Sequence, residues 1–231
     1  MIAIAIDGPS GAGKSTIARA IARKFGFLYV DTGAVYRAVG LAVLREGLCP
    51  RDQADVAALL PSLRIAIEHT GGEQAVILNG ENVNESIRTP EISMAASDCS
   101  KWPSVRAFLL DLQRRAAVEN NVVMDGRDIG TVVLPHAQIK IFLTADPADR
   151  ARRRYKELIG RGLQVDYQEV LADVNARDEQ DSGRAVAPLK PADDAVIVDT
   201  TGNTLERSIA VLTQLAEDLL LPICQERRSN T

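Results

Sequence analysis

Apolar residues along the chain follow two patterns, short continuous runs and longer stretches of helical spacing. The continuous runs cover residues 1–6, 28–30, 121–124, 138–143 and 195–198. Runs of this length, partly β-branched and ended by polar residues or glycine, are typical of strands buried on both faces of a sheet. The sequence therefore predicts five buried strands.

Helices are predicted between these runs. Apolar residues recur every three or four positions in residues 17–25, 35–44, 104–118 and 205–220. N-cap signals stand at Thr89-Pro90, Asp146-Pro147 and Asp166, and we expect the tail to fray beyond Pro222. Strands that alternate with helices predict an α/β fold, a five-stranded parallel sheet with helices on both faces.

Residues 62–88 break this rhythm. Leu63, Ile65 and Ile67 alternate with other residues, and a second apolar segment leads into Asn79-Gly80. Asn-Gly between two such segments favours a β-hairpin. We therefore expect one domain over residues 1–231 that carries a small antiparallel insertion at 62–88.

Composition narrows the class of protein. With 46% hydrophobic and 25% charged residues the chain resembles soluble globular proteins, and its net charge of −4 argues against general binding to nucleic acid or membrane surfaces. Three cysteines without a C-x-x-C spacing favour a reducing compartment, and the first residues suit a strand better than a secretion signal. His69 and His136 have no metal-ligand spacing. We expect a cytoplasmic protein.

The loop between the first strand and the first helix carries the clearest chemical signal. Residues 8–15 fit G-x-x-x-x-G-K-[ST], the phosphate-binding P-loop, in the strand-loop-helix context that this pattern requires. The alternative is a glycine-rich turn that happens to precede a helix. In a P-loop, backbone amides surround the phosphates, Lys14 approaches the β- and γ-phosphates, and Ser15 offers a hydroxyl to Mg²⁺. The expected phosphate-site residues are Gly8, Pro9, Ser10, Gly11, Ala12, Gly13, Lys14, Ser15 and Thr16.

Three further motifs resemble those of bacterial cytidylate kinases. They are Asp-Thr-Gly-Ala-Val-Tyr-Arg at 31–37, Asp-Gly-Arg-Asp at 125–128, and the segment 177–189, which ends in Arg-Ala-Val-Ala-Pro-Leu. The resemblance extends from the P-loop to the last helix and includes the insertion. It implies a P-loop nucleoside monophosphate kinase, a monomer that transfers the γ-phosphate of ATP to CMP or dCMP with Mg²⁺.

The resemblance also assigns residues to the acceptor nucleotide. It implies that Arg37, Arg127 and Arg184 hold the acceptor phosphate and that Arg177 and Asp181 lie near the sugar. Phosphoryl transfer between two polyanions requires positive groups from several segments. The alternative is that these are ordinary solvated surface arginines.

Base choice has a chemical reason in the same motifs. Cytosine presents an N4 amino donor that a carboxylate pairs with, and uracil presents a carbonyl there. By resemblance Asp128 fits this role, with Arg106 and Ser97 as donors to the acceptor edge and Thr32 nearby. Asp128 could instead be a turn or cap residue after a strand. The resemblance gives the catalytic set as Lys14, Arg127, Asp128 and Arg153.

The basic stretch after Asp146 can be interpreted in two ways. Arginines on a helix usually form a solvated face, but the resemblance implies a mobile lid over ATP at 147–165, with Arg153 as the preferred contact. Gln180 and Ser182 stand where relatives carry basic residues, so the charge on the lid side is expected to be weaker.

Three other functions compete with this interpretation. Another small-molecule kinase would act on UMP, AMP or a non-nucleotide acceptor. A GTPase switch would need an Asn-Lys-x-Asp motif after a core strand, and the chain contains none. A partner-driving ATPase would hydrolyse ATP without an acceptor.

Overall fold

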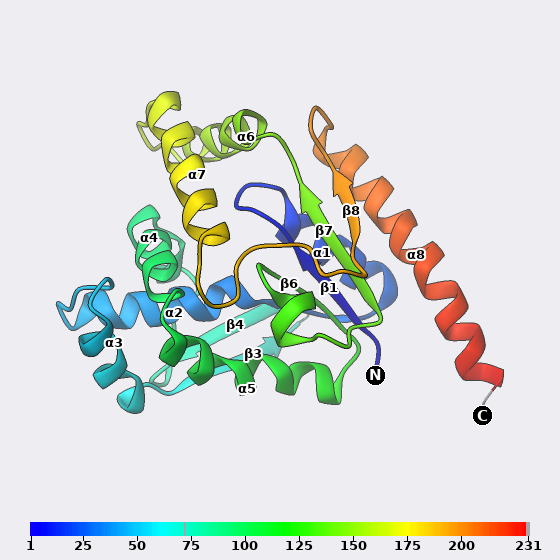
Figure 1. Cartoon of the computed structure of the whole chain (residues 1–231), viewed down its shortest axis with the longest axis horizontal. Coiled ribbons are helices and arrows are strands. Elements are labelled where there is room, and N and C mark those ends of the chain that lie inside the picture. The colour runs from blue at the N-terminus through cyan, green and yellow to red at the C-terminus, as the bar shows by residue number, and fades with distance from the viewer. Residues whose placement is uncertain (72, 230–231) are drawn as a thin grey trace.

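A five-stranded parallel sheet forms the centre of the computed structural model, which describes residues 1–71 and 73–229 and the side chains up to residue 225 (Figure 1). Gly72, in the predicted insertion, lies outside the described residues. In spatial order the strands are β2 (Leu28–Asp31), β6 (Val122–Gly126), β1 (Ala3–Asp7), β7 (Ile139–Thr144) and β8 (Val196–Asp199). All four pairings are parallel, so the prediction of fold class is confirmed.

The register of the sheet places the ends of β1, β2 and β6 at the same level. Asp31 at the end of β2 pairs with Asp125 of β6, and Asp7 at the end of β1 pairs with Gly126. The loops after these strands therefore leave the sheet side by side at its carboxyl edge, where ligands bind in open α/β sheets.

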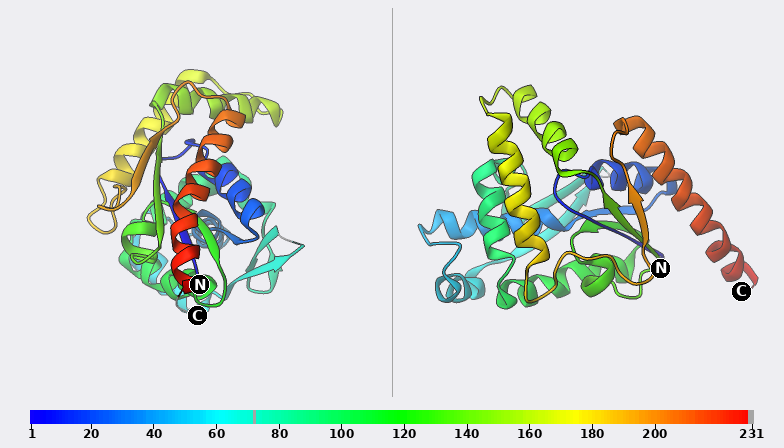
Figure 2. Two further views of the ribbon diagram at one scale, coloured as in Figure 1. Left: turned by 90° about the vertical axis from the view of Figure 1, so that its right-hand side faces the viewer. Right: turned by 45° about the horizontal axis from the view of Figure 1, so that its top comes forward.

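Helices cover both faces of the sheet (Figure 2). On one face Ile4 and Ile6 pack with α1 (Lys14–Phe25) and α8 (Leu205–Ser229). On the other, Ala5 and Met124 pack near α5 (Pro103–Glu119) and the π-helical turn η3 (Ile129–Val133). Helix α8 continues past Pro222 to Ser229, so the expectation of a frayed tail there is wrong. Apolar packing of Leu220 and Ile223 offsets the loss of one backbone hydrogen bond at the proline.

A second core lies beside β2. It joins α2 (Thr32–Arg45), α3 (Gln53–Leu59), α4 (Pro90–Cys99) and the short turns η1 (Leu60–Ser62) and η2 (Ser86–Arg88) to a three-stranded antiparallel sheet. That sheet consists of β3 (Ile65–Thr70), β4 (Glu73–Leu78) and β5 (Glu81–Asn82). Asn79 and Gly80 have φ of 50° and 89° and form the predicted hairpin turn.

The small sheet contacts the free edge of β2 through side chains. The Gln74 amide donates to the Asp31 carbonyl over 3.1 Å and accepts from the Asp31 N–H over 2.8 Å. The Nε2 atom of His69 lies 3.0 Å from the Tyr29 carbonyl. These side chains fix the small sheet against the strand that leads into α2.

Helices α6 (Pro147–Gly160) and α7 (Tyr167–Ser182) stand above the carboxyl edge of the sheet as a pair (Figure 2). Asp146 and Asp166 cap them as predicted, each accepting two backbone N–H groups. Their contact has its own apolar cluster of Ala151, Leu158, Val170 and Val174. Across the described part of the chain, no helix has both the length and the apolar character that spanning a bilayer requires.

Candidate functional site

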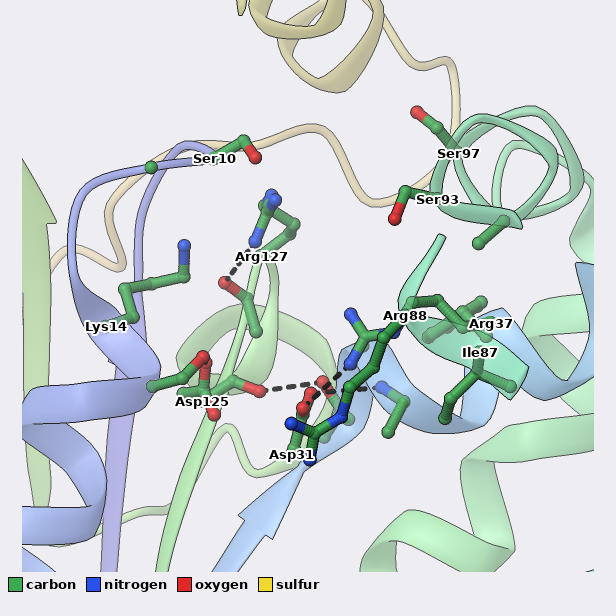
Figure 3. A pocket seen from close by; sticks show the side chains of 18 of the residues that line it. Ser10, Lys14, Asp31, Arg37, Ile87, Arg88, Ser93, Ser97, Asp125 and Arg127 are labelled. Atoms are coloured by element: carbon green, nitrogen blue, oxygen red, sulfur yellow. Dashed lines mark hydrogen bonds and ion pairs between the residues drawn. The ribbon is translucent and has the colours of Figure 1, made fainter. Parts of the chain in front are cut away.

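A cavity of about 900 Å³ opens at the carboxyl edge of the sheet. Figure 3 shows Lys14, Arg127 and Arg37 pointing into the same space, with Ser93 and Ser97 of α4 on its far side. All the residues predicted to bind the acceptor line it, together with Arg153 and most of the P-loop. The predicted residues at its wall are Ser10, Gly11, Gly13, Lys14, Ser15, Thr16, Thr32, Arg37, Ser97, Arg106, Arg127, Asp128, Arg153, Arg177, Asp181 and Arg184.

Three of the predicted P-loop residues shape the loop without lining the cavity. Gly8 has φ of 148°, and a Cβ there would lie 1.9 Å from the Leu143 carbonyl oxygen, so only glycine permits this approach to β7. The Pro9 carbonyl accepts from Lys14 Nζ at 2.7 Å, and Ala12 is buried. Burial and then the charge of Arg127 hold the pKa of Lys14 well below its usual value.

A carboxylate at the end of β6 connects the P-loop helix with β2. Asp125 accepts from Ser15 Oγ at 2.9 Å and from the Tyr29 hydroxyl at 2.8 Å. Burial raises the pKa of Asp125 to about 6, and the charge of Asp31 adds to this rise. Sequence reasoning gave Tyr29 no role, because a tyrosine within a short apolar strand carries no signal of its own.

Three arginines from two distant chain segments meet around one buried carboxylate. Arg127 Nε donates to Asp181 Oδ2 at 2.8 Å, and Arg184 pairs with the other oxygen of Asp181. Burial alone would raise the pKa of Asp181, but Arg127 and Arg184 hold it below its usual range. Burial and the charge of Arg127 lower the pKa of Arg177 to about 10. Positive charge in this cluster therefore exceeds what Asp181 compensates.

The start of α2 places Arg37 on the same cavity. Asp31 is the N-cap of the helix and accepts from the Ala34 N–H at 3.0 Å. Its second oxygen accepts from Arg37 at 2.8 Å. The Thr32 hydroxyl donates to the Asp125 carbonyl at 2.8 Å and joins α2 to the end of β6.

Asp128 and Arg106 form a buried ion pair at the wall of the cavity. Asp128 occupies the N-cap position of η3, but its side chain makes no capping bond there. Asp128 therefore stands at the cap position after a strand, as the alternative interpretation has it, but its side chain does not cap the turn. The Ser97 hydroxyl is buried and has no hydrogen-bond partner among the residues that the structure describes.

The charge of the cavity is opposite to that of the chain. Eleven basic and six acidic side chains line it, an excess of five positive charges, whereas the chain has a formal net charge of −4. Like charges held together in a partly buried site favour a polyanionic ligand, which would relieve their repulsion.

The arginines of the basic helix α6 lie in different surroundings. Arg153 lines the cavity but donates to the Thr200 carbonyl and to Asp149, each at 2.7 Å. Arg150, which sequence reasoning missed among its basic neighbours, is buried, donates to the Ser10 carbonyl at 3.0 Å and pairs with Asp178 of α7. It therefore connects the P-loop to both helices of the pair.

Gln180 and Ser182 lie away from the cavity wall. Gln180 Nε2 approaches Asp98 of α4 at 3.4 Å, and the Ser182 hydroxyl donates to the Asp178 carbonyl. Weaker charge on the lid side stays a prediction.

Comparison with known proteins identifies the family. The family model described as cytidylate kinase matches residues 4–218. The chain belongs to the cytidylate kinase family. The expectation of a kinase, and hence of an enzyme, is confirmed by this membership.

Curated members of the cytidylate kinase family match nearly the whole chain. The protein named cytidylate kinase from Caldicellulosiruptor bescii is 48% identical over 93% of this chain and 95% of its own length. The protein named cytidylate kinase from Caldanaerobacter subterraneus is 50% identical over 90% of this chain and 91% of its own length. Among solved structures, an uncharacterized protein from Eubacterium ventriosum shares the fold, with a TM-score of 0.53 and 13% identity over 94% of this chain and 98% of that one.

Proposed function

We propose that this member of the cytidylate kinase family transfers the γ-phosphoryl group of ATP to CMP and dCMP, giving ADP and CDP or dCDP. The observation that carries the proposal is the shared cavity, in which the P-loop faces the arginine cluster and the Asp128–Arg106 pair. Family membership supports the same reaction.

The P-loop holds the donor phosphates. Residues 8–16 wrap them with backbone amides at the start of α1, and Lys14 leaves the Pro9 carbonyl to reach the transferring group. Its lowered pKa reflects burial among positive charges, a condition that bound phosphates reverse.

The arginine cluster aligns the acceptor phosphate and sugar. Arg37, Arg127 and Arg184 hold the phosphate opposite Lys14, while Arg177 and Asp181 lie at the sugar. Arg127 also neutralises charge as the phosphoryl group moves. Little covalent chemistry is left for the protein, because alignment and charge neutralisation account for most of catalysis in phosphoryl transfer.

The base is read by the buried pair at the cavity wall. Asp128 accepts from cytosine N4, while Arg106 and the buried Ser97 hydroxyl donate to N3 and O2, with Thr32 beside them. Uracil places a carbonyl oxygen against Asp128, so it leaves a buried charge poorly paired.

Mg²⁺ fits the residues between the two nucleotides. Ser15 offers a hydroxyl and Asp125 a carboxylate that repels Asp31, and a divalent cation would relieve that repulsion. When bound with ATP, the ion neutralises phosphate charge. Mg²⁺ in such sites needs only one or two protein ligands, which is consistent with the lack of a larger acidic or histidine cluster in the described residues.

Residues 147–165 act as the lid over ATP in this proposal. Arg153 exchanges its bond to the Thr200 carbonyl for a contact with the donor nucleotide as the lid closes. We also propose that the protein is a monomer and that it lies in the cytoplasm. The free thiols of Cys49, Cys99 and Cys224 are consistent with such a reducing compartment.

A change at Asp128 tests the proposal. With Asp128→Ala we expect kcat/KM for CMP to fall about hundredfold or more and the preference for CMP over UMP to collapse, because the carboxylate acceptor is gone. A coupled assay with CMP, dCMP, UMP and AMP measures both effects. Asp173→Ala, an exposed aspartate of α7, is the control and should leave the rates unchanged. Equal turnover of UMP by the unaltered enzyme would contradict the role of Asp128.

A further inference from the structure

A further buried carboxylate lies behind the cavity wall, between the start of the P-loop and the turn that follows β6. Asp7 is the last residue of β1, directly before Gly8 of the P-loop, and only 4% of its surface is exposed. Asp7 Oδ1 accepts from the Ile129 N–H and Oδ2 from the Gly130 N–H, both at 2.8 Å. These amides are the first two after Asp128.

The Asp7 bonds supply the cap that η3 does not receive from its own N-cap residue. The first amides of a helical turn have no partner within the turn, and leaving such an amide buried and unpaired destabilises the fold. Asp128 occupies the capping position, yet its carboxylate pairs with Arg106 instead. Because Asp7 satisfies the amides from β1, the Asp128 carboxylate remains available at the cavity wall.

Packing leaves the Asp7 side chain little freedom. Its backbone pairs with Gly126 on one side and Phe142 on the other, so it is fixed in the centre of the sheet. A Cβ at Gly130 would lie 3.4 Å from Asp7 Oδ2 and 3.1 Å from Lys140 Cδ. The Asp7 carboxylate and the Gly130 backbone therefore lie in close contact.

Burial and the nearby charge of Asp128 both disfavour the ionised form of the Asp7 carboxyl. Burial raises the pKa of Asp7 to about 6, and the charge of Asp128 adds to this rise, while the two amide bonds lower it. A neutral cap would avoid both the desolvation and the repulsion. The carboxylate offers a separate oxygen to each of the two backbone N–H groups. An asparagine or serine side chain has only one oxygen.

We infer that Asp7 is a positioning residue for base selection, which fixes the turn after β6 so that the Asp128 carboxylate faces the acceptor base. The inference rests on the proposed role of Asp128. Asp7 is not among the residues that line the cavity, and its carboxylate accepts from the Ile129 and Gly130 amides. It also joins the strand that leads into the P-loop to the turn that reads the base.

Asp7→Asn tests the inference, because the amide keeps one acceptor and turns a donor toward the second N–H. We expect the kcat/KM ratio of CMP to UMP to fall about tenfold or more, mainly through KM for CMP, while KM for ATP changes less than about twofold. Asp52→Asn is the matched control, since Asp52 accepts two backbone amides as the exposed N-cap of α3. In Asp52→Asn the kcat/KM ratio of CMP to UMP should not change.

A double variant separates positioning from a general structural effect. If Asp7 acts through Asp128, Asp7→Asn should reduce the ratio no further once Asp128→Asn is present. Any of three results would overturn the inference. The two substitutions could reduce the CMP-to-UMP ratio independently, so that their effects multiply in the double variant. Folded Asp7→Asn could keep the ratio unchanged, or it could raise KM for ATP and KM for CMP equally. If Asp7→Asn does not fold, Asp7→Ser, whose small hydroxyl accepts one amide, takes its place in the same assays.

The same assays keep the two proposals apart. Should Asp128→Asn keep the preference for CMP, the proposed base reading fails and this inference fails with it. Should Asp128→Asn lose the preference while Asp7→Asn retains it, only the inference fails.

Discussion

The donor and acceptor sides of the cavity are built in different ways. The phosphate-binding part of the donor side is one continuous segment, residues 8–16, which runs from the end of a buried strand into the first turn of α1. The acceptor side collects Thr32 and Arg37 from α2, Ser97 from α4, Arg106 from α5 and further residues from the end of β6, from α7 and from the segment directly after α7. A contiguous site depends on local backbone geometry, whereas a dispersed site depends on how distant elements pack. Substitutions on the two sides should therefore have different effects on the kinetic constants for ATP and for the acceptor nucleotide.

The largest effect is expected on the donor side. Lys14→Met removes the positive charge at the transferring phosphate, so we expect kcat/KM to fall about thousandfold, and equally for CMP and UMP. Steady-state rates with each acceptor measure this. Lys24→Met, in the last turn of the same helix and paired with Glu217, should stay within about twofold of the unaltered enzyme. A loss confined to CMP would show that Lys14 serves the acceptor.

A packing change should affect the acceptor side alone. A Cβ at Gly40 would lie 2.8 Å from the Ala96 backbone nitrogen, where α2 crosses α4. We expect Gly40→Ala to lower the free energy of unfolding by about 2 kcal/mol and to raise KM for CMP, because α4 carries Ser97. KM for ATP should not change. Denaturant unfolding and steady-state kinetics measure these effects. Gly160→Ala, with no atom within 4 Å of the added methyl, is the control for the free energy of unfolding only, because Gly160 belongs to the proposed lid. A parallel rise in KM for ATP would contradict the separation of the two sides.

The smallest effect concerns Asp7, where the two sides meet. Its pKa is about 6 in the folded protein and near 3.8 when unfolded, so the folded state binds the proton more tightly. The stability that Asp7 contributes is therefore greatest below pH 3.8 and is lost as the pH rises through 6. Between pH 5 and 7 the unfolding free energy of the unaltered protein should fall by about 1 kcal/mol relative to Asp7→Asn. Urea denaturation at several pH values checks this, and a rise instead would contradict the burial-driven shift.

Sequence reasoning succeeded where the signal was local. Apolar runs predicted the five strands, and Asn79-Gly80 predicted the hairpin, because both depend on neighbouring residues alone. The P-loop pattern likewise lies within a few residues. Resemblance to the family was needed for the acceptor side, since no local rule relates Arg37 to Arg184.

Other features had no local signal. Asp7 bonds to amides 122 and 123 residues away, and nothing in its neighbourhood distinguishes it from a residue that ends a strand. Arg150 looks like its basic neighbours until packing buries it against the P-loop. Pro222 predicted an end to the helix, but tertiary packing overrides the cost of one lost hydrogen bond.

The contact between Gln74 and β2 has a consequence for behaviour in solution. β2 is an outer strand of the main sheet, and such strands offer unpaired donors and acceptors to strands of other molecules. At Asp31 both backbone groups already bond to one amide side chain, as they would to a sixth strand. Another strand could pair with this edge only after displacing the Gln74 amide. We therefore expect Gln74 to disfavour edge-to-edge association as well as to hold the small sheet in place.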